Sequence, residues 1–464
     1  MRNAIQIAGS ADSVTLQGDA SAIYSVLTLA KRSSFVPRAT PRSGYLVQGD
    51  SFDLVNSPTL SNTRVYQQNV DGAFSPGAIQ NLTFSYSTGG PVDGGALLSV
   101  TSAAARSIAL NNVRFIGSHR GWNGNGNLYM SLRSFNAAAP LNTSLTLTDV
   151  LVALTGQANS FNGTTGGSAF LHSWNNNGVV SISGSTFNEA GYASSFNFLA
   201  FSLTAAGNYT LVNNTFRRTS NATVRPEGNR LGSVVANLSG NTFQDGSYLD
   251  LYGNVGSVTL NSNTFSTIAG GYGIRVSDPV TGTPTLSGTN VFTGGGLALK
   301  FVKATAGTTS LAGSVTVNGS SFSRLLAGGQ AADVITGTAA NDWISGDTGN
   351  DSLTGGIGDD SFVFATTLNA ATNVDTITDF KASGSGTDKI LLASSVFTGL
   401  GTGTLNASDF GTAALIGTDV VYDSSTKGLY FAAGGAATLA GYTLFATLGG
   451  TSTVTPANTD FIVF

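Results

Sequence analysis

The sequence predicts an all-β protein made of stacked coils, with a long solenoid followed by a tighter roll and a further β-rich domain. Three observations support this fold class. Only 10% of the 464 residues are charged, whereas exposed helix faces normally carry many Glu, Lys and Arg residues. The chain has 60 glycines and abundant Ser, Thr and Asn, a composition typical of short strands joined by tight turns. Two internal repeats, one of 22 to 30 residues and one of nine, indicate coils.

Composition also excludes several classes of protein. The chain has no cysteine and 2 histidines, so disulfides and thiolate metal sites are excluded and histidine-based chemistry has little scope. No run of 18 apolar residues occurs, so we expect no transmembrane helix. The first residues lack the apolar core of a cleavable signal peptide. We predict no nucleic-acid partner.

The longer repeat joins an alternating strand to a bend and a phenylalanine. Its clear copies end at Phe187, Phe216, Phe243 and Phe265, and weaker copies end at Phe115, Phe292 and Phe322. A period this short suits one coil of a solenoid, whose apolar face only the next coil can cover. In register, the phenylalanines would form one internal ladder and the asparagines of the bends another. The alternative is an antiparallel β-sandwich, but sandwiches do not repeat a tetrapeptide at a fixed coil length.

This pattern resembles the right-handed parallel β-helix of pectate-lyase-like and tailspike-like proteins, and the resemblance assigns residues 79–325 to that fold. Residues 1–78 show no clear period. They include a basic, proline-containing stretch at 31–42, which fits a linker, an exposed arm or an N-terminal cap of the solenoid. The sequence leaves these three alternatives open.

The shorter repeat places Asp333, Asp342, Asp351 and Asp360 nine residues apart. It matches the G-G-x-G-x-D-x-U-x repeat of calcium-binding β-rolls, here over residues 326–365. Two nonapeptides complete one coil, so turns 18 residues apart should lie together. We therefore expect Asp333 to pair with the turn ending at Asp351, and Asp342 with the turn ending at Asp360.

Calcium prefers hard oxygen ligands, and Gly-rich turns supply backbone carbonyls beside a carboxylate. The predicted cofactor is Ca²⁺, and the expected metal-site residues are Asp333, Asp342, Gly346, Asp347, Gly349, Asp351, Gly355, Gly356, Gly358, Asp360 and Asp379. The first two repeats carry Ala331 and Ala340 in place of the fourth glycine, which predicts weaker half-sites. The alternative is that these turns only end strands.

The remaining residues, 366–464, also carry recognisable motifs. Asp375-Thr-Ile-Thr-Asp379-Phe380 and Asp388-Lys-Ile resemble the segment that closes the roll in the repeats-in-toxin family. The end, Asp460-Phe-Ile-Val-Phe464, is similar to the uncleaved C-terminal signal of proteins exported by the type I system. This resemblance implies a C-terminal type I secretion domain, the type I secretion machinery as a partner, and a location outside the cell or at the bacterial cell surface.

Charge is divided unevenly between the two parts of the chain. Residues 1–325 carry 18 Lys and Arg against 12 Asp and Glu, a net charge of +6. Residues 326–464 carry 3 Lys against 13 Asp, a net charge of −10. A mildly basic solenoid favours binding to anionic cell-surface polysaccharide or to the acidic domain of another copy of the chain. Head-to-tail contacts of this kind build open filaments or lattices when the rotation does not close.

We therefore expect a secreted, calcium-binding structural or adhesive protein that self-assembles into a surface layer or extracellular filament. The alternative is a lyase, epimerase or hydrolase of uronic-acid polymers, since parallel β-helices often carry such sites. The densest charged cluster lies between Arg217 and Asp250. In addition, Glu189, Arg218 and Asp245 on successive coils each follow a ladder phenylalanine by two residues, an alternation of sign that indicates ion pairing between coils. We assign no catalytic residue and no organic cofactor, and enzymatic activity stays open.

Overall fold

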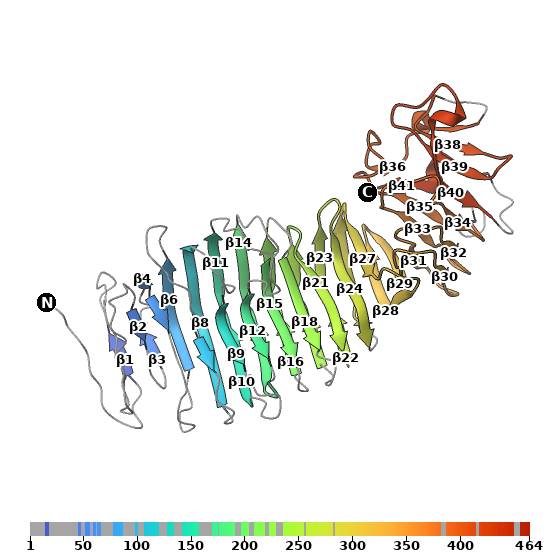
Figure 1. Ribbon diagram of the computed structural model, residues 1–464. Coiled ribbons are helices and arrows are strands. Elements are labelled where there is room, and N and C mark those ends of the chain that lie inside the picture. The colour runs from blue at the N-terminus through green and yellow to red at the C-terminus, as the bar shows by residue number, and fades with distance from the viewer. Residues whose placement is uncertain are drawn as a thin grey trace. The chain divides into compact units, whose positions relative to one another are not determined.

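A computed structural model confirms the all-β fold class, a parallel β-helix followed by a β-roll (Figure 1). It describes side chains at residues 107–114, 116, 142–153, 176–188, 209–217, 235–251, 257–277, 284–381, 387–413, 417–449 and 455–464, and further strands by their backbone. The chain divides into two compact units, Met1–Val258 and Thr259–Phe464. No helix of the described residues is long and apolar enough to cross a membrane.

In the first unit, the coils contribute strands to two large parallel sheets, and the larger sheet contains two rows of strands. The long strand β8 (Arg106–His119) pairs with the first strands of two rows. One row contains β10 (Thr143–Thr148), β13 (Val179–Ser183), β16 (Asn208–Val212) and β19 (Val235–Ser239). The next contains β11 (Leu151–Gly156), β14 (Thr186–Ala190), β17 (Thr215–Arg218) and β20 (Thr242–Gln244).

The second large sheet of this unit contains β7 (Leu98–Val100), β9 (Leu128–Arg133), β12 (Ala169–Trp174), β15 (Phe196–Leu203), β18 (Ala222–Gly228) and β21 (Tyr248–Asn254). Towards the N-terminus lie β1 (Val14–Gln17), β2 (Tyr45–Val47), β3 (Phe52–Val55), β4 (Thr59–Ser61), β5 (Thr63–Val65) and β6 (Ala78–Tyr86). Strands β1, β3 and β6 pair in parallel, and β6 pairs with β8. The proposed boundaries at residues 78, 325 and 365 stay predictions.

The two predicted ladders are present inside this unit. Phe216 stacks on Phe187 and Phe243, with ring centroids 5.2 and 5.0 Å apart. Asn214 donates from its backbone N–H and its side-chain amide to Oδ1 of Asn241, at 3.0 Å each. The side-chain oxygen of the buried asparagine thus accepts the backbone N–H at the bend of the neighbouring coil. An apolar residue at this position would leave that buried N–H without a hydrogen-bond partner, so the repeat needs an asparagine there.

The second unit begins with further coils, formed by β22 (Ser257–Asn261), β23 (Thr264–Thr267), β24 (Tyr272–Thr281), β25 (Thr285–Ser287), β26 (Asn290–Gly294) and β27 (Leu297–Val302). Phe265 and Phe292 continue the stacking, with centroids 4.6 Å apart. The same bend is held by Asn263, which donates its backbone N–H to Oδ1 of Asn290 at 3.0 Å.

The expected repeat ending at Phe322 is wrong. Strands β28 (Thr308–Val317) and β29 (Ser320–Gly328) are antiparallel, and Val317 takes the place beside Phe292 in the ladder. The connecting residues Asn318 and Gly319 both have positive φ, at 47° and 87°, as a two-residue hairpin turn requires. The chain therefore reverses where the sequence pattern predicted another coil.

The roll that follows is built on two parallel sheets. One contains β30 (Val334–Thr336), β32 (Ser352–Thr354) and β34 (Asp375–Ile377), and the other contains β31 (Asp342–Ser345), β33 (Ser361–Phe364) and β35 (Lys389–Leu392). The apolar positions of the nonapeptide, Ile335, Ile344, Leu353 and Phe362, are all buried in one core. The predicted 18-residue coil is confirmed, since Trp343 lies opposite Ser361 in the register.

The C-terminal residues extend both sheets of the roll. Strand β40 (Thr443–Leu448) pairs with β34, and β41 (Phe461–Val463) pairs with β35. The rest comprises β36 (Gly403–Thr404), β37 (Phe410–Thr412), β38 (Val420–Asp423), β39 (Gly428–Phe431) and the short 3-10 helices η1 (Ala407–Asp409), η2 (Leu439–Gly441) and η3 (Asn458–Asp460). Phe397 and Phe445 pack edge to face in the shared core.

Candidate metal centre

One edge of the roll carries a column of three buried aspartates from successive coils. Asp333 precedes β30, Asp351 precedes β32 and Asp375 begins β34. The backbone N–H of Asp333 donates to Oδ1 of Asp351 at 2.7 Å, and that of Asp351 donates to Oδ1 of Asp375 at 3.2 Å. The predicted pairing of Asp333 with the turn ending at Asp351 is confirmed.

The opposite edge repeats this arrangement. The N–H of Asp342 donates to Oδ1 of Asp360 at 2.9 Å, and the N–H of Asp360 donates to Oδ1 of Asp388 at 3.1 Å. All three residues are almost fully buried. The predicted pairing of Asp342 with the turn ending at Asp360 is confirmed. Both columns also continue into the segment that follows the four nonapeptides.

The glycine that opens each turn leaves room for the carboxylate that closes it. A Cβ on Gly346 would lie 2.2 Å from Oδ2 of Asp351, and a Cβ on Gly355 would lie 2.4 Å from Oδ2 of Asp360. Within the turns, Gly349 has a φ of 136°, which side chains rarely tolerate. The glycine that opens each turn is therefore a steric requirement of a turn folded around its own carboxylate, whereas the second glycine is needed in the last two turns and is replaced by Ala331 and Ala340 in the first two.

Four carboxylate oxygens in these turns are buried without a hydrogen-bond partner. They are Oδ1 of Asp342 and Oδ2 of Asp347, Asp351 and Asp360. An unpaired buried anion is strongly unfavourable. Burial, reinforced by the charges of neighbouring aspartates, raises the pKa of both Asp351 and Asp360 to about 7. Burial raises the pKa of Asp375 well above its ordinary value, and raises that of Asp388 as well.

These oxygens fit a hard cation held by few side chains. Among the described residues, no three Asp, Glu or His side chains converge on one point. An ion here would therefore bind one or two carboxylates together with backbone carbonyls. Such carbonyls are present. The carbonyl oxygen of Gly346 would lie 2.4 Å from a Cβ placed on Gly328, and that of Gly355 would lie 2.2 Å from a Cβ placed on Gly337. Both carbonyls therefore face the opening glycine of the turn on the neighbouring coil. An oxygen-only set of this kind suits Ca²⁺.

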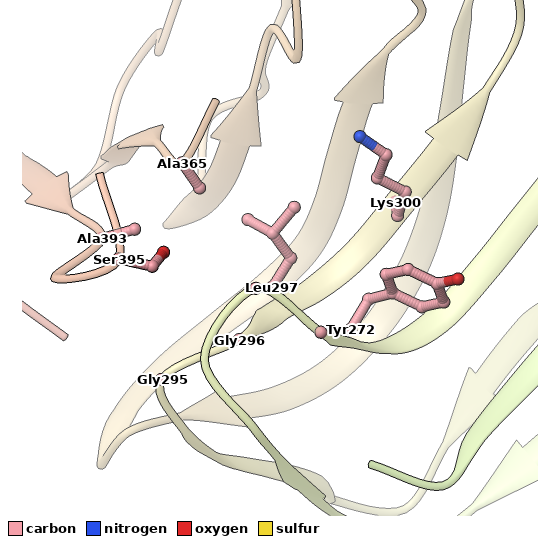
Figure 2. Close-up of a pocket in the computed structure, with 10 residues that line it drawn as sticks. Tyr272, Gly295, Gly296, Leu297, Lys300, Ala365, Ala393 and Ser395 are labelled. Carbon is pink, nitrogen blue, oxygen red and sulfur yellow. The ribbon is translucent and has the colours of Figure 1, made fainter. Parts of the chain in front are cut away.

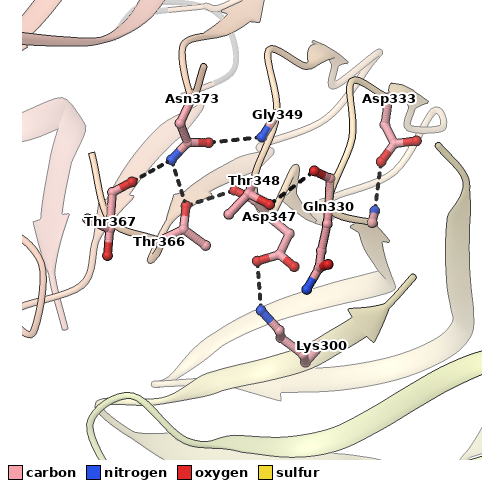
Figure 3. Close-up of polar contacts among 10 residues, drawn as sticks. Lys300, Gln330, Asp333, Asp347, Thr348, Gly349, Thr366, Thr367 and Asn373 are labelled. Carbon is pink, nitrogen blue, oxygen red and sulfur yellow. Dashed lines mark hydrogen bonds and ion pairs between the residues drawn. The ribbon is translucent and has the colours of Figure 1, made fainter. Parts of the chain in front are cut away.

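Asp379 and Asp347, like Asp333, are predicted ligands that already have protein partners. Asp379 accepts hydrogen bonds from the backbone N–H groups of Gly355 at 2.9 Å and Gly356 at 2.8 Å, so both its oxygens are engaged. Asp347 forms an ion pair with Lys300, whose Nζ lies 2.7 Å from Oδ1 (Figure 3). The ligand roles of all three residues stay predictions.

Three residues of the site were not predicted from the sequence: Asp375, Asp388 and Lys300. The two aspartates carry the same Asp-x-Ile signature as Asp333-Val-Ile335, and this signature could have found them. Their spacing hid them, since they follow the preceding aspartates of their columns by 24 and 28 residues instead of 18. No sequence signal connects Lys300 with Asp347, which lies 47 residues away.

Comparison with known families supports the calcium assignment. Residues 327–362 match the RTX calcium-binding nonapeptide repeat, in four copies. The matched residues contain Asp333, Asp342, Asp351 and Asp360, whose carboxylates are buried in the two columns. A search of curated proteins found no match to the chain.

Other candidate sites offer less chemistry. Asp245 of the predicted charge column forms an ion pair at 2.5 Å with Arg217, which the prediction did not include, and both partners are exposed, so the pair adds little stability. The side chains of the other two predicted members, Glu189 and Arg218, lie outside the described residues. A cavity of about 80 Å³ is lined by Tyr272, Leu297, Lys300, Ser395 and glycine backbone (Figure 2). Its lining contains no carboxylate for acid–base catalysis. The two histidines of the chain are His119 and His172, and their side chains lie outside the described residues.

Proposed function

We propose that this protein is a secreted calcium-binding protein whose roll folds around Ca²⁺ outside the cell. The observation that carries the proposal is that buried carboxylate oxygens in three nonapeptide turns, those ending at Asp342, Asp351 and Asp360, have no hydrogen-bond partner. A divalent cation would neutralise these groups and restore their ordinary pKa. Because the unfolded chain has no preformed site, binding free energy would then be folding free energy.

Calcium-coupled folding suits export through a one-step secretion channel. Cytosolic calcium is too low to fill such sites, so the roll would stay loose inside the cell and fold where calcium is abundant. The resemblance of residues 366–464 to type I secretion domains supports this route, as does the association of such repeats with secreted proteins. The type I machinery is the partner that this part of the proposal requires.

We further propose a structural or adhesive role at a bacterial surface, with copies of the chain assembling into a layer or filament. The supporting observation is the division of charge, +6 on residues 1–325 and −10 on residues 326–464. Opposite charges on two parts of one chain favour head-to-tail contacts between copies. The basic part would also favour anionic cell-surface polysaccharide.

Electron microscopy of the full chain tests the assembly. We expect regular polymers in millimolar calcium and none in chelator. Asp360→Asn should shift polymerisation to higher calcium, whereas Asp409→Asn, at a half-buried aspartate in η1 outside the two columns, should not. Monodisperse particles under all conditions, together with cleavage or epimerisation of a uronic-acid polymer, would support the enzymatic alternative instead.

A further inference from the structure

One lysine of the last β-helix coils reaches into the first turns of the roll. Lys300 lies on β27, and its ammonium contacts Oδ1 of Asp347 at 2.7 Å (Figure 3). Both side chains are largely buried, with 24% of Lys300 and 4% of Asp347 exposed. Removing either partner of a buried ion pair is strongly destabilising, because the other charge is then left buried and uncompensated.

The oxygen atoms around this ion pair already accept hydrogen bonds from protein groups. The Thr366 hydroxyl donates to the carbonyl of Asp347 at 2.8 Å, and the Thr348 hydroxyl donates to the carbonyl of Gln330 at 3.3 Å. The two oxygens of Asp333 accept the backbone N–H groups of Gly307 and Gly329. Where the roll meets the β-helix coils, protein donors therefore satisfy carbonyls and carboxylates that elsewhere would bind an ion.

The opposite edge lacks such a cation at its carboxylates. Among the described side chains, neither Asp342 nor Asp360 forms an ion pair, and each keeps one oxygen without a partner. Lys381 lies on this edge, but its ammonium donates to the carbonyl of Gly356 rather than to a carboxylate. The two edges therefore differ in the ammonium group at a carboxylate of a nonapeptide turn, which only the edge containing Asp347 has among the described side chains. Unpartnered oxygens occur on both edges, since Oδ2 of Asp347 and Oδ2 of Asp351 also lack a hydrogen-bond partner.

We propose that the Lys300 ammonium substitutes for a calcium ion at Asp347. The turn at 346–351 then binds one ion fewer on the side that faces the β-helix coils. This tethered cation also fixes the first turns of the roll to β27 before calcium binds, giving the roll a nucleus at that end. The inference rests on the proposed calcium binding, and it assigns to Lys300 a position that the repeat pattern would give to an ion.

Calcium stoichiometry of the full chain tests the substitution. By isothermal titration calorimetry in calcium-depleted buffer, Lys300→Met should bind one more Ca²⁺ per chain than the wild type. Lys300→Arg, which keeps the charge, should bind the wild-type number. In chelator, Lys300→Met should melt about 5 °C or more below the wild type, and calcium should remove most of that difference. Equal stoichiometry in Lys300→Met and the wild type would overturn the proposal.

A second measurement does not depend on the variants folding. In wild-type crystals grown with calcium, we expect ions at the column containing Asp360 and none within the 2.3–2.6 Å coordination distance of Asp347. An ion bound directly to Asp347 would refute the substitution while leaving the calcium-binding function intact. A wild-type chain that binds no calcium at all would instead contradict the proposed function and, with it, this inference.

Discussion

The backbone N–H of Asp342 donates to Oδ1 of Asp360 at 2.9 Å, while Oδ2 of Asp360 is buried with no hydrogen-bond partner. One carboxylate therefore has two separate tasks. The first oxygen sets the register between successive coils, and the second is left for a cation. Asp351 repeats the relationship on the other edge, where Oδ1 accepts the N–H of Asp333 and Oδ2 is unpartnered. The distinction predicts how variants of these residues will behave.

Replacing Asp360 by Asn should have opposite effects with and without calcium. An amide oxygen can still accept the N–H of Asp342, but the group no longer carries the negative charge that attracts Ca²⁺. We expect calcium affinity to fall by about tenfold or more, and stability in chelator to stay equal or rise because a buried charge is gone. Calorimetry and thermal melting measure both effects. Equal calcium affinity in Asp360→Asn and the Asp409→Asn control would contradict this prediction.

Stability should depend on pH in opposite directions in the two calcium states. In calcium-free buffer, Asp351 and Asp360 have folded-state pKa values near 7, above the ordinary value of 3.8, so the folded chain binds more protons than the unfolded chain between these values. Protonation of these two carboxyl groups therefore stabilises the folded chain. This stabilisation is complete below about pH 4 and is lost as the pH rises through 7. Urea midpoints should therefore be lower at pH 8 than at pH 5.

With saturating calcium the dependence should reverse, because protons compete with Ca²⁺ for the same oxygens. Calcium affinity is expected to decrease as pH falls below 7. The measurement is the midpoint of calcium titrations at several pH values, with intrinsic fluorescence as the signal. An affinity that stays constant from pH 8 to pH 5 would show that these carboxylates are not ligands.

Gly355→Ala should destabilise the roll even when calcium is present. The added Cβ would lie 2.4 Å from Oδ2 of Asp360, so either the turn or the carboxylate must move. Gly401→Ala is the matched control, because its Cβ would meet no atom closer than 3.8 Å. We expect the first variant to bind calcium more weakly and melt earlier, and the second to resemble the wild type. Equal melting of the two variants would show that the turn does not need this glycine.

The stacked phenylalanines should carry much of the stability of the first unit. Phe216 is fully buried between two rings, and Phe216→Ala should lower the free energy of unfolding by about 3–5 kcal/mol. Val235→Ala, at a position 38% exposed, should change it by less than about 0.5 kcal/mol. Urea denaturation of both variants measures the difference. A similar loss in both would mean that the ladder contributes no special packing.

Much of this structure could be predicted from the sequence, because repetition encodes contacts between coils. The register of Phe187 on Phe216, and of Asp342 beside Asp360, follows directly from the two periods. Prediction failed where the period ended. The hairpin at Asn318-Gly319 reverses the chain within a segment that still fits the repeat, and only the pairing of β28 with β29 distinguishes a hairpin from another coil.

The candidate site shows the same limit. The four regular aspartates were found by spacing, whereas Asp375 and Asp388 take the same positions after longer connections. Lys300 could not be found at all, because its contact with Asp347 depends on how the last β-helix coils meet the roll and not on any local pattern. Local repeats therefore predict the turns, whereas tertiary packing determines which cationic group, if any, lies beside the carboxylates of each turn.

The central claim is that the aspartate columns require calcium to be stable, and hydrogen–deuterium exchange of the full chain tests it most directly. Peptides from residues 327–392 include the amides of Asp342, Asp351 and Asp360, while peptides from 235–251 report on the β-helix. We predict that calcium slows exchange strongly in the first set and leaves the second unchanged. Equal protection of residues 327–392 in calcium and in chelator would contradict the account.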